Sequence, residues 1–251
     1  MLALAVALGV IVGIALGAVG AGGSILTIPL LVYAMGVDVH SATGTSLLIV
    51  GASALVGTTF HARSGQVEWP AVVTFSVVGM GAALAGSLLN HRLPGAVILG
   101  GLATLMVIVA VRMWQQRKVD ASATGTRRGW LVVAAAGAGV GVLTGLFGVG
   151  GGFILVPALA LVLGLSMTAA VATSLPIIAF NSAAGLVPYV ATDRIDYSIA
   201  ALFIAGSVAG MTLGTTIGKR AGETRLREAF AMLMILVAGY LVFQQAAGMS
   251  T

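Results

Sequence analysis

The chain has 251 residues, of which 59% are hydrophobic and only 8% are charged. Soluble domains carry about 25% charged residues, so this chain cannot cover a water-facing surface and is predicted to be an integral membrane protein. The net charge of +5 comes from basic residues in short hydrophilic loops, as expected beside membrane helices, so no nucleic-acid partner is expected. Cysteine is absent, which excludes disulfides and thiolate metal sites, and no cofactor is expected.

Apolar stretches of helical length follow one another along the chain. The first half holds 2–19, 24–36, 42–60, 69–89 and 95–113, and the second half holds 130–147, 153–165, 169–190, 197–217 and 228–243. Such lengths suit membrane helices better than the short alternating strands of an outer-membrane barrel, so the predicted fold is an all-α polytopic membrane helix bundle. The first stretch lacks a basic start and a cleavage site, so it is predicted to be a membrane helix and not a signal peptide.

One long hydrophilic segment, from Arg112 to Arg128, separates the two halves. It predicts an N-terminal membrane repeat over 1–114, a cytoplasmic linker over 115–128 and a C-terminal membrane repeat over 129–251. The halves repeat one another at a constant offset of 128 residues, and 17–47 aligns with 145–175 without a gap. The match therefore indicates an internal duplication.

Loop charges indicate how the two copies are oriented. The linker and 218–228 are rich in basic residues, which favours the cytoplasm for both, whereas the C-terminal tail has no Lys or Arg. Equivalent loops would then lie on opposite sides, as in an inverted repeat with an odd number of crossings per half. In that arrangement 24–36 is a short, broken crossing of roughly 20 Å. The alternative is a parallel repeat with four crossings per half, in which 24–36 is re-entrant or merges with the first helix.

A glycine cluster followed by a proline interrupts the apolar sequence in each half. Paired interruptions in corresponding halves indicate a transport site, because freed backbone groups must face protein or an aqueous cavity. A helix that begins after the glycines would direct its N–H groups at an anion. The alternative role is tight helix packing, which we expect instead at the small-residue seams 82–86 and 210–214. The candidate anion-binding residues of the two clusters are Gly20, Gly22, Gly23 and Ser24, and Gly148, Gly150, Gly151 and Gly152.

Hydroxyl and amide side chains follow each cluster at matching positions. Thr45 and Ser46 correspond to Thr173 and Ser174, and we expect these four to donate to the same anion. The alternative is that each hydroxyl bonds back to a carbonyl of its own helix. Asn181 is an amide where the first half has a serine, and it marks either a substrate contact or a contact between helices.

Charged residues are absent from the interior of every apolar stretch, so no carboxylate proton relay through the membrane is expected. The three histidines, His40, His61 and His91, lie at stretch ends, where loop capping is expected, although His40 beside Asp38 could titrate. No metal site is predicted, and no arrangement of residues indicates an enzyme.

The motif from Gly148 to Leu175, with its degenerate first copy, resembles the TauE/SafE-type sulfite exporter family of anion permeases. The resemblance covers nearly the whole chain and implies export of small sulfur-containing anions, such as sulfite or organosulfonates, from bacterial cells. The first copy departs from the motif at Ser24, Thr27 and Gly44, which leaves the identity of the substrate open.

These features together predict a secondary transporter of the bacterial inner membrane that exports a small anion by alternating access between two repeats. Its expected partners are the anionic substrate and the lipid bilayer, with H⁺ or Na⁺ as the candidate coupling ion. A passive anion channel and a membrane-embedded enzyme are the alternatives. The sequence does not identify the oligomeric state.

Overall fold

The computed structural model describes residues 2–19, 22–62, 65–115, 130–221 and 223–246, and every regular element in these segments is a helix. The predicted all-helical class is confirmed. Gly20 and most of the predicted linker, 116–128, lie outside the described residues. The elements are α1 (Leu2–Val19), α2 (Gly22–Pro29), the π-helix η1 (Leu30–Ala34), α3 (Val39–Ala62), α4 (Trp69–Asn90), α5 (Gly95–Gln115), α6 (Trp130–Phe147), α7 (Gly152–Leu163), α8 (Met167–Ala191), α9 (Tyr197–Ala221) and α10 (Glu223–Ala246).

The helices lie on the predicted apolar stretches, with two informative differences. Helix α10 begins at Glu223, five residues before the apolar stretch at 228, so its first turn is formed by the polar, basic segment. The second stretch changes from α-helix to π-helix after Pro29, whose missing N–H removes one hydrogen bond from the helical ladder. The π-helix then stops where Gly36 adopts a φ of +69° and the N–H of Val37 bonds to the Leu31 carbonyl at 3.0 Å.

The outer surface of the bundle is apolar. Among the described residues, four helices are long and apolar enough to cross a membrane: Val39–Phe60, Trp69–Asn90, Met167–Ala191 and Tyr197–Gly218. One face of α4 and one face of α10 present large hydrophobic side chains outward, including Val77 and Phe243, each 69% exposed. Buried threonines and serines lie inside the bundle instead. This distribution suits a protein surrounded by lipid.

Two helix pairs pack with their backbones in contact, and each pair joins one half to the other. Helix α1 packs along α9, and α6 packs along α4. A Cβ added to Gly210 would collide with the Val10 carbonyl, and one added to Gly86 would collide with the Val142 carbonyl. The predicted packing seams at 82–86 and 210–214 are thus confirmed, because only glycine allows this approach.

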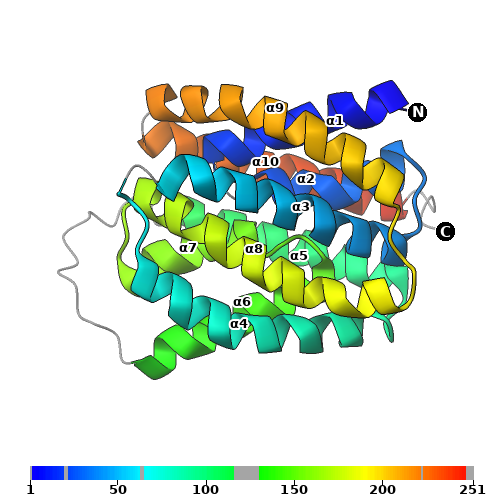
Figure 1. The fold of residues 1–251 in the computed structure, drawn as a ribbon, viewed down its shortest axis with the longest axis horizontal. Helices are drawn as coiled ribbons and strands as arrows, with labels where there is room; N and C mark the ends of the chain where they lie inside the picture. The colour runs from blue at the N-terminus through cyan, green and yellow to red at the C-terminus, as the bar shows by residue number, and fades with distance from the viewer. Residues whose placement is uncertain (1, 20–21, 63–64, 116–129, 222, 247–251) are drawn as a thin grey trace.

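Helices α3 and α8 pack against each other in the middle of the bundle, between the α1–α9 pair and the α4–α6 pair (Figure 1). The start of α1 and the end of α10 lie at the same end of the bundle as the turns at 91–94 and 192–196, and the turn at 65–68 lies at the opposite end (Figure 1). Helices α2 and α7 are shorter than α3 and α8 and contact each other. The bundle therefore contains two short helices beside a central pair of long ones.

Candidate functional site

The glycine cluster of the second half forms a sharp break between two helices. Helix α6 ends at Phe147, and α7 begins at Gly152. Gly148, Gly150 and Gly151 have φ values of +65°, +67° and +68°, in the left-handed region that glycine adopts without strain. The sequence of backbone conformations therefore requires glycine, and the predicted interruption of the helix is observed.

Backbone N–H groups are left without partners at this break. The N–H of Gly148 bonds to the Thr144 carbonyl at 2.9 Å, and that of Leu155 bonds to the Gly151 carbonyl at 2.8 Å. Between them, the N–H groups of residues 149–153 make no hydrogen bond with a described residue. Residues 149–153 are all buried. Successive N–H groups around left-handed residues form a concave, positively polarised surface that suits an anion.

The break lies at mid-depth in the bundle. A Cβ added to Gly150 would touch Val50 and would lie 3.2 Å from a methyl group of Ile178, and these two residues are near the middle of α3 and α8. The same Cβ would lie 3.3 Å from the hydroxyl oxygen of Ser182. That hydroxyl is buried and has no hydrogen-bond partner. An unsatisfied hydroxyl thus adjoins the unsatisfied N–H groups at the centre of the protein.

Asn181, beside Ser182, faces a different helix. A Cβ on Gly79 of α4 would come within 2.6 Å of the Asn181 side-chain oxygen, so the amide fills the space that a glycine leaves. Its Oδ1 atom is buried and unpartnered. At the corresponding place in the first half, the hydroxyls of Ser53 and Ser207 bond each other at 2.5 Å. The larger amide is therefore matched by a smaller neighbour, which identifies Asn181 as a contact between α4 and α8.

The first-half break repeats the packing of the second. Helix α1 ends at Val19 and α2 begins at Gly22, with Gly20 outside the described residues. A Cβ on Gly23 would collide with Val12 and Leu16, and a Cβ on Gly151 would meet their counterparts Val140 and Thr144. Ser24 is buried, and one turn further along, the Thr27 hydroxyl donates to the Gly23 carbonyl at 3.3 Å. The contacts of Gly23 thus correspond to those of Gly151.

Thr45 and Thr173 occupy equivalent positions at opposite ends of the bundle. The Thr45 hydroxyl accepts a hydrogen bond of 3.0 Å from the N–H of Asp196, just before α9. The Thr173 hydroxyl accepts one of 3.0 Å from the N–H of Glu68, just before α4. Each threonine therefore caps the start of a long helix from the other half, and the structure does not bring the two together at the glycine breaks.

Each of these threonines is followed by a serine. The Ser174 hydroxyl donates to the Val171 carbonyl at 2.8 Å, which is the alternative bond within its own helix. The Ser46 hydroxyl is buried and has no partner. Ser182 and Thr144 were not among the predicted site residues, although both lie against the second-half break. The sequence does indicate the Ser182 hydroxyl as a further donor, from its place beside Asn181, whereas no sequence pattern indicates Thr144.

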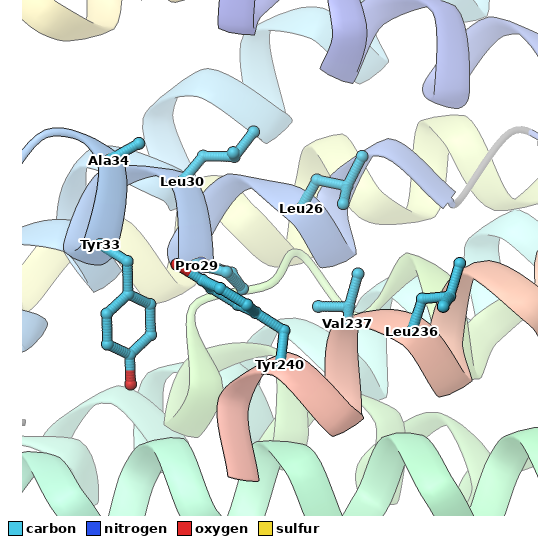
Figure 2. Close-up of a pocket in the computed structure, with 8 residues that line it drawn as sticks. All are labelled: Leu26, Pro29, Leu30, Tyr33, Ala34, Leu236, Val237 and Tyr240. Atoms are coloured by element: carbon cyan, nitrogen blue, oxygen red, sulfur yellow. The ribbon is translucent and has the colours of Figure 1, made fainter. Parts of the chain in front are cut away.

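A separate apolar cavity of about 220 Å³ lies between the short first-half helix and α10 (Figure 2). Pro29 and Leu26 of α2 and Val237 of α10 line it, and the rings of Tyr33 and Tyr240 meet edge to face with their centroids 5.5 Å apart. The cavity offers almost no polar surface, so it is unsuited to an anion.

The whole chain matches proteins of one family. The model of the family described as sulfite exporter TauE/SafE matches residues 5–241. A probable membrane transporter protein of Xylella fastidiosa is 34% identical over 247 residues, which cover 96% of this chain and 95% of that protein. The probable membrane transporter protein YdhB of Bacillus subtilis is 27% identical and covers 92% of this chain and 96% of its own length. No solved structure matches the chain. The chain therefore belongs to the sulfite exporter TauE/SafE family of membrane transporters.

Proposed function

We propose that this protein is a secondary transporter that exports a small sulfur-containing oxyanion, such as sulfite or an organosulfonate, across the bacterial inner membrane. The observation that carries the proposal is the row of unbonded, buried N–H groups at residues 149–153, at mid-depth in the bundle. Buried backbone donors are nearly always paired in proteins, so an unpaired row of them calls for a ligand that accepts hydrogen bonds.

An oxyanion matches this row of donors chemically. Its oxygens accept several hydrogen bonds at once, and the first turn of α7 adds the positive end of the helix dipole. The Ser182 hydroxyl, next to Gly150, would complete the contacts on the α8 side. Gly22, Gly23 and Ser24 of the first half would contribute from α2, which contacts α7. The side chains nearest the second-half break are uncharged, so an anion would be held weakly enough to be released.

We further propose that the two halves are inverted repeats and that they alternate access to this site. The bonds Thr45–Asp196 and Thr173–Glu68 support this arrangement, because they are equivalent in sequence and lie at opposite ends of the bundle (Figure 1). Each bond ties α3 or α8 of one half to a long helix of the other. Loosening one bond while keeping the other would open one end of the bundle at a time. The cavity behind α2 and η1 gives the short first-half helix room to shift.

Transport and binding can be tested with the purified full chain. In proteoliposomes loaded with sulfite, we expect saturable efflux, and we expect its rate to respond to either a proton or a sodium gradient. A thermal-denaturation screen with sulfite, sulfate, thiosulfate, sulfonates and carboxylates would identify the preferred anion, because a ligand that binds only the folded state raises the midpoint.

The same experiments separate the alternatives. Flux that follows the membrane potential without saturating would indicate a passive channel. Turnover of a lipid or peptide that depends on His40 or His61 and tolerates Gly151→Val would indicate a membrane-embedded enzyme. Saturable efflux that Gly151→Val abolishes would support the proposed transporter.

A further inference from the structure

Two histidines, an asparagine and a tyrosine from three helices meet at the end of the bundle that holds the 91–94 turn. The Nδ1 atom of His40, at the start of α3, lies 3.0 Å from Oδ1 of Asn90, the last residue of α4. The Asn90 amide nitrogen donates to the Leu146 carbonyl of α6 at 2.6 Å. That bond fixes the asparagine oxygen as an acceptor, so His40 must carry its proton on Nδ1.

His91 completes the cluster. Its ring is parallel to that of His40, with centroids 6.4 Å apart and 5° between the planes, and it lies 4.7 Å from the ring of Tyr189. The Nε2 atom of His91 and the hydroxyl of Tyr189 are both buried without a hydrogen-bond partner. This side-chain cluster therefore holds a basic nitrogen that is shielded from water and free to accept a proton.

The opposite end of the bundle has no equivalent of the His40–Asn90 bond. At an offset of 128 residues, Thr168 replaces His40 and Gly218 replaces Asn90, so no bond between an imidazole and an amide can form there. The two ends thus share the threonine–backbone bonds described above and differ in this cluster. A titratable contact is built into one end of a bundle whose halves otherwise correspond.

We propose that His40 and His91 form a proton-binding site and that protonation of this pair opens their end of the bundle to solvent. Two imidazolium rings at this spacing would repel each other across the contact between α3 and α4. A cavity of about 520 Å³, lined in part by Asp38, Ser41 and Asp196, lies at the same end of the bundle. The consequence for the transport cycle rests on the proposed function, but the proton site itself does not.

The surrounding charges act in both directions. The Asp38 carboxylate accepts hydrogen bonds from the backbone N–H groups of His40 and Ser41, at 3.0 and 3.2 Å, so a negative charge lies at the start of α3. Arg194 opposes protonation of His91. The charged and titratable groups around the pair are Asp38 before α3, Arg92 after α4, Tyr189 of α8, and Asp193 and Arg194 before α9.

Burial lowers the pKa of His91 below its ordinary value, and Arg194 and His40 lower it further. Exposure to water would restore the ordinary value of about 6.5. The open arrangement therefore binds protons more tightly than the packed one, and it is favoured as the pH falls from the ordinary value toward the lowered one. Above that window His91 is neutral and the end stays packed.

The absence of cysteine makes a clean accessibility test feasible. Ser46 and Ser174 are both fully buried and correspond at the offset of 128, and Ser46 lies on α3 toward the histidine end. We would measure the maleimide labelling rates of Ser46→Cys and Ser174→Cys between pH 8 and pH 5, each with and without His40→Gln and His91→Gln. For each cysteine variant, the ratio is the labelling rate with both histidines present divided by the rate with both replaced, at the same pH. This ratio cancels the effect of pH on the ionisation of the thiol itself.

For Ser46→Cys, we expect the ratio to rise as the pH falls, because protonation favours the open arrangement over the packed one. For Ser174→Cys, we expect no rise. A ratio that stays at one for Ser46→Cys at every pH, or that rises equally for Ser174→Cys, would overturn the proposal.

A second measurement needs no substitution of the histidines. The chain has three histidines, so ¹⁵N-histidine NMR of the unaltered protein can follow each titration. We expect one ring to titrate below the ordinary range and a second to shift with it. Three independent titrations at ordinary values would contradict the proposal. If labelling depends on pH while no anion is transported, the proton site stands and the proposed transport function fails.

Discussion

The two glycine clusters differ in backbone conformation and in the side chains that surround them. Gly151 has a left-handed backbone before α7, whereas its counterpart Gly23 lies within α2. In the second half, Thr144 and Ser182 lie beside the break. Their counterparts at an offset of 128 are Leu16 and Ala54, both apolar. The two copies have therefore diverged in the polar side chains beside their glycines, with Thr144 and Ser182 in the second half and Ser24 and Thr27 in the first.

This difference suggests a division of labour between the halves. The second-half break, with rigid left-handed glycines and polar neighbours, would provide most of the substrate contacts. In the first half, α2 and the π-helix η1 adjoin an apolar cavity, and these two elements would move during transport. Substitutions that exchange features between the halves can test this assignment.

The largest effect is expected from Gly151→Val. The backbone there has a φ of +68°, and a Cβ would overlap the Thr144 hydroxyl. Backbone strain and side-chain overlap would cost about 3 kcal/mol, which corresponds to roughly hundredfold weaker anion binding if the valine distorts the backbone between α6 and α7. The measurement is the anion-dependent rise in the thermal midpoint, together with efflux from proteoliposomes. Gly139→Ala on α6 is the matched control, because a Cβ there meets nothing within 4 Å. Equal anion binding by both variants would refute the site.

A smaller effect is expected from Ser182→Ala. Removal of one hydroxyl donor should weaken anion binding by about 1 kcal/mol, or roughly fivefold, while the free protein stays as stable as before because that hydroxyl has no partner. Isothermal titration with the preferred anion measures the change. Ser87→Ala is the control, because that buried hydroxyl only bonds back to the Leu84 carbonyl of its own helix. If Ser182→Ala destabilises the free protein and leaves the affinity unchanged, the hydroxyl has a structural role only.

The smallest effects are expected from Thr45→Val and Thr173→Val, and they should resemble each other. Each variant removes the acceptor for one helix-starting N–H group, which costs about 1 kcal/mol of stability. Thermal denaturation should show similar falls for the two single variants and an additive fall for the double variant, since the bonds lie far apart. A large loss in one variant and none in the other would break the proposed equivalence of the two halves.

Helix positions and the interruptions could be predicted from the sequence, because both depend on local patterns. Apolar runs of helical length predict the helices, and the paired glycine clusters at an offset of 128 predict where the helical pattern is interrupted. The π-helix after Pro29 could not be predicted, since a proline is compatible with several local adjustments of a helix.

The candidate site was predictable only in part. The glycine cluster at 148–152 is locally encoded, but the position of Thr45 and Thr173 at opposite ends depends on which helices face which. The hydroxyl of Ser182 gains its place beside Gly150 only through the packing of α8. Side chains that join distant segments depend on tertiary packing, which no spacing in a single sequence reveals.

The central claim is that backbone N–H groups at the second-half break bind the anion, and glycine amide NMR tests it most directly. Protein labelled with ¹⁵N at its 36 glycines would be titrated with sulfite in detergent micelles. We predict saturable shifts of the Gly150, Gly151 and Gly152 amides, with a midpoint equal to that of the thermal stabilisation. Unchanged resonances at these three positions, in protein that still transports sulfite, would contradict the claim.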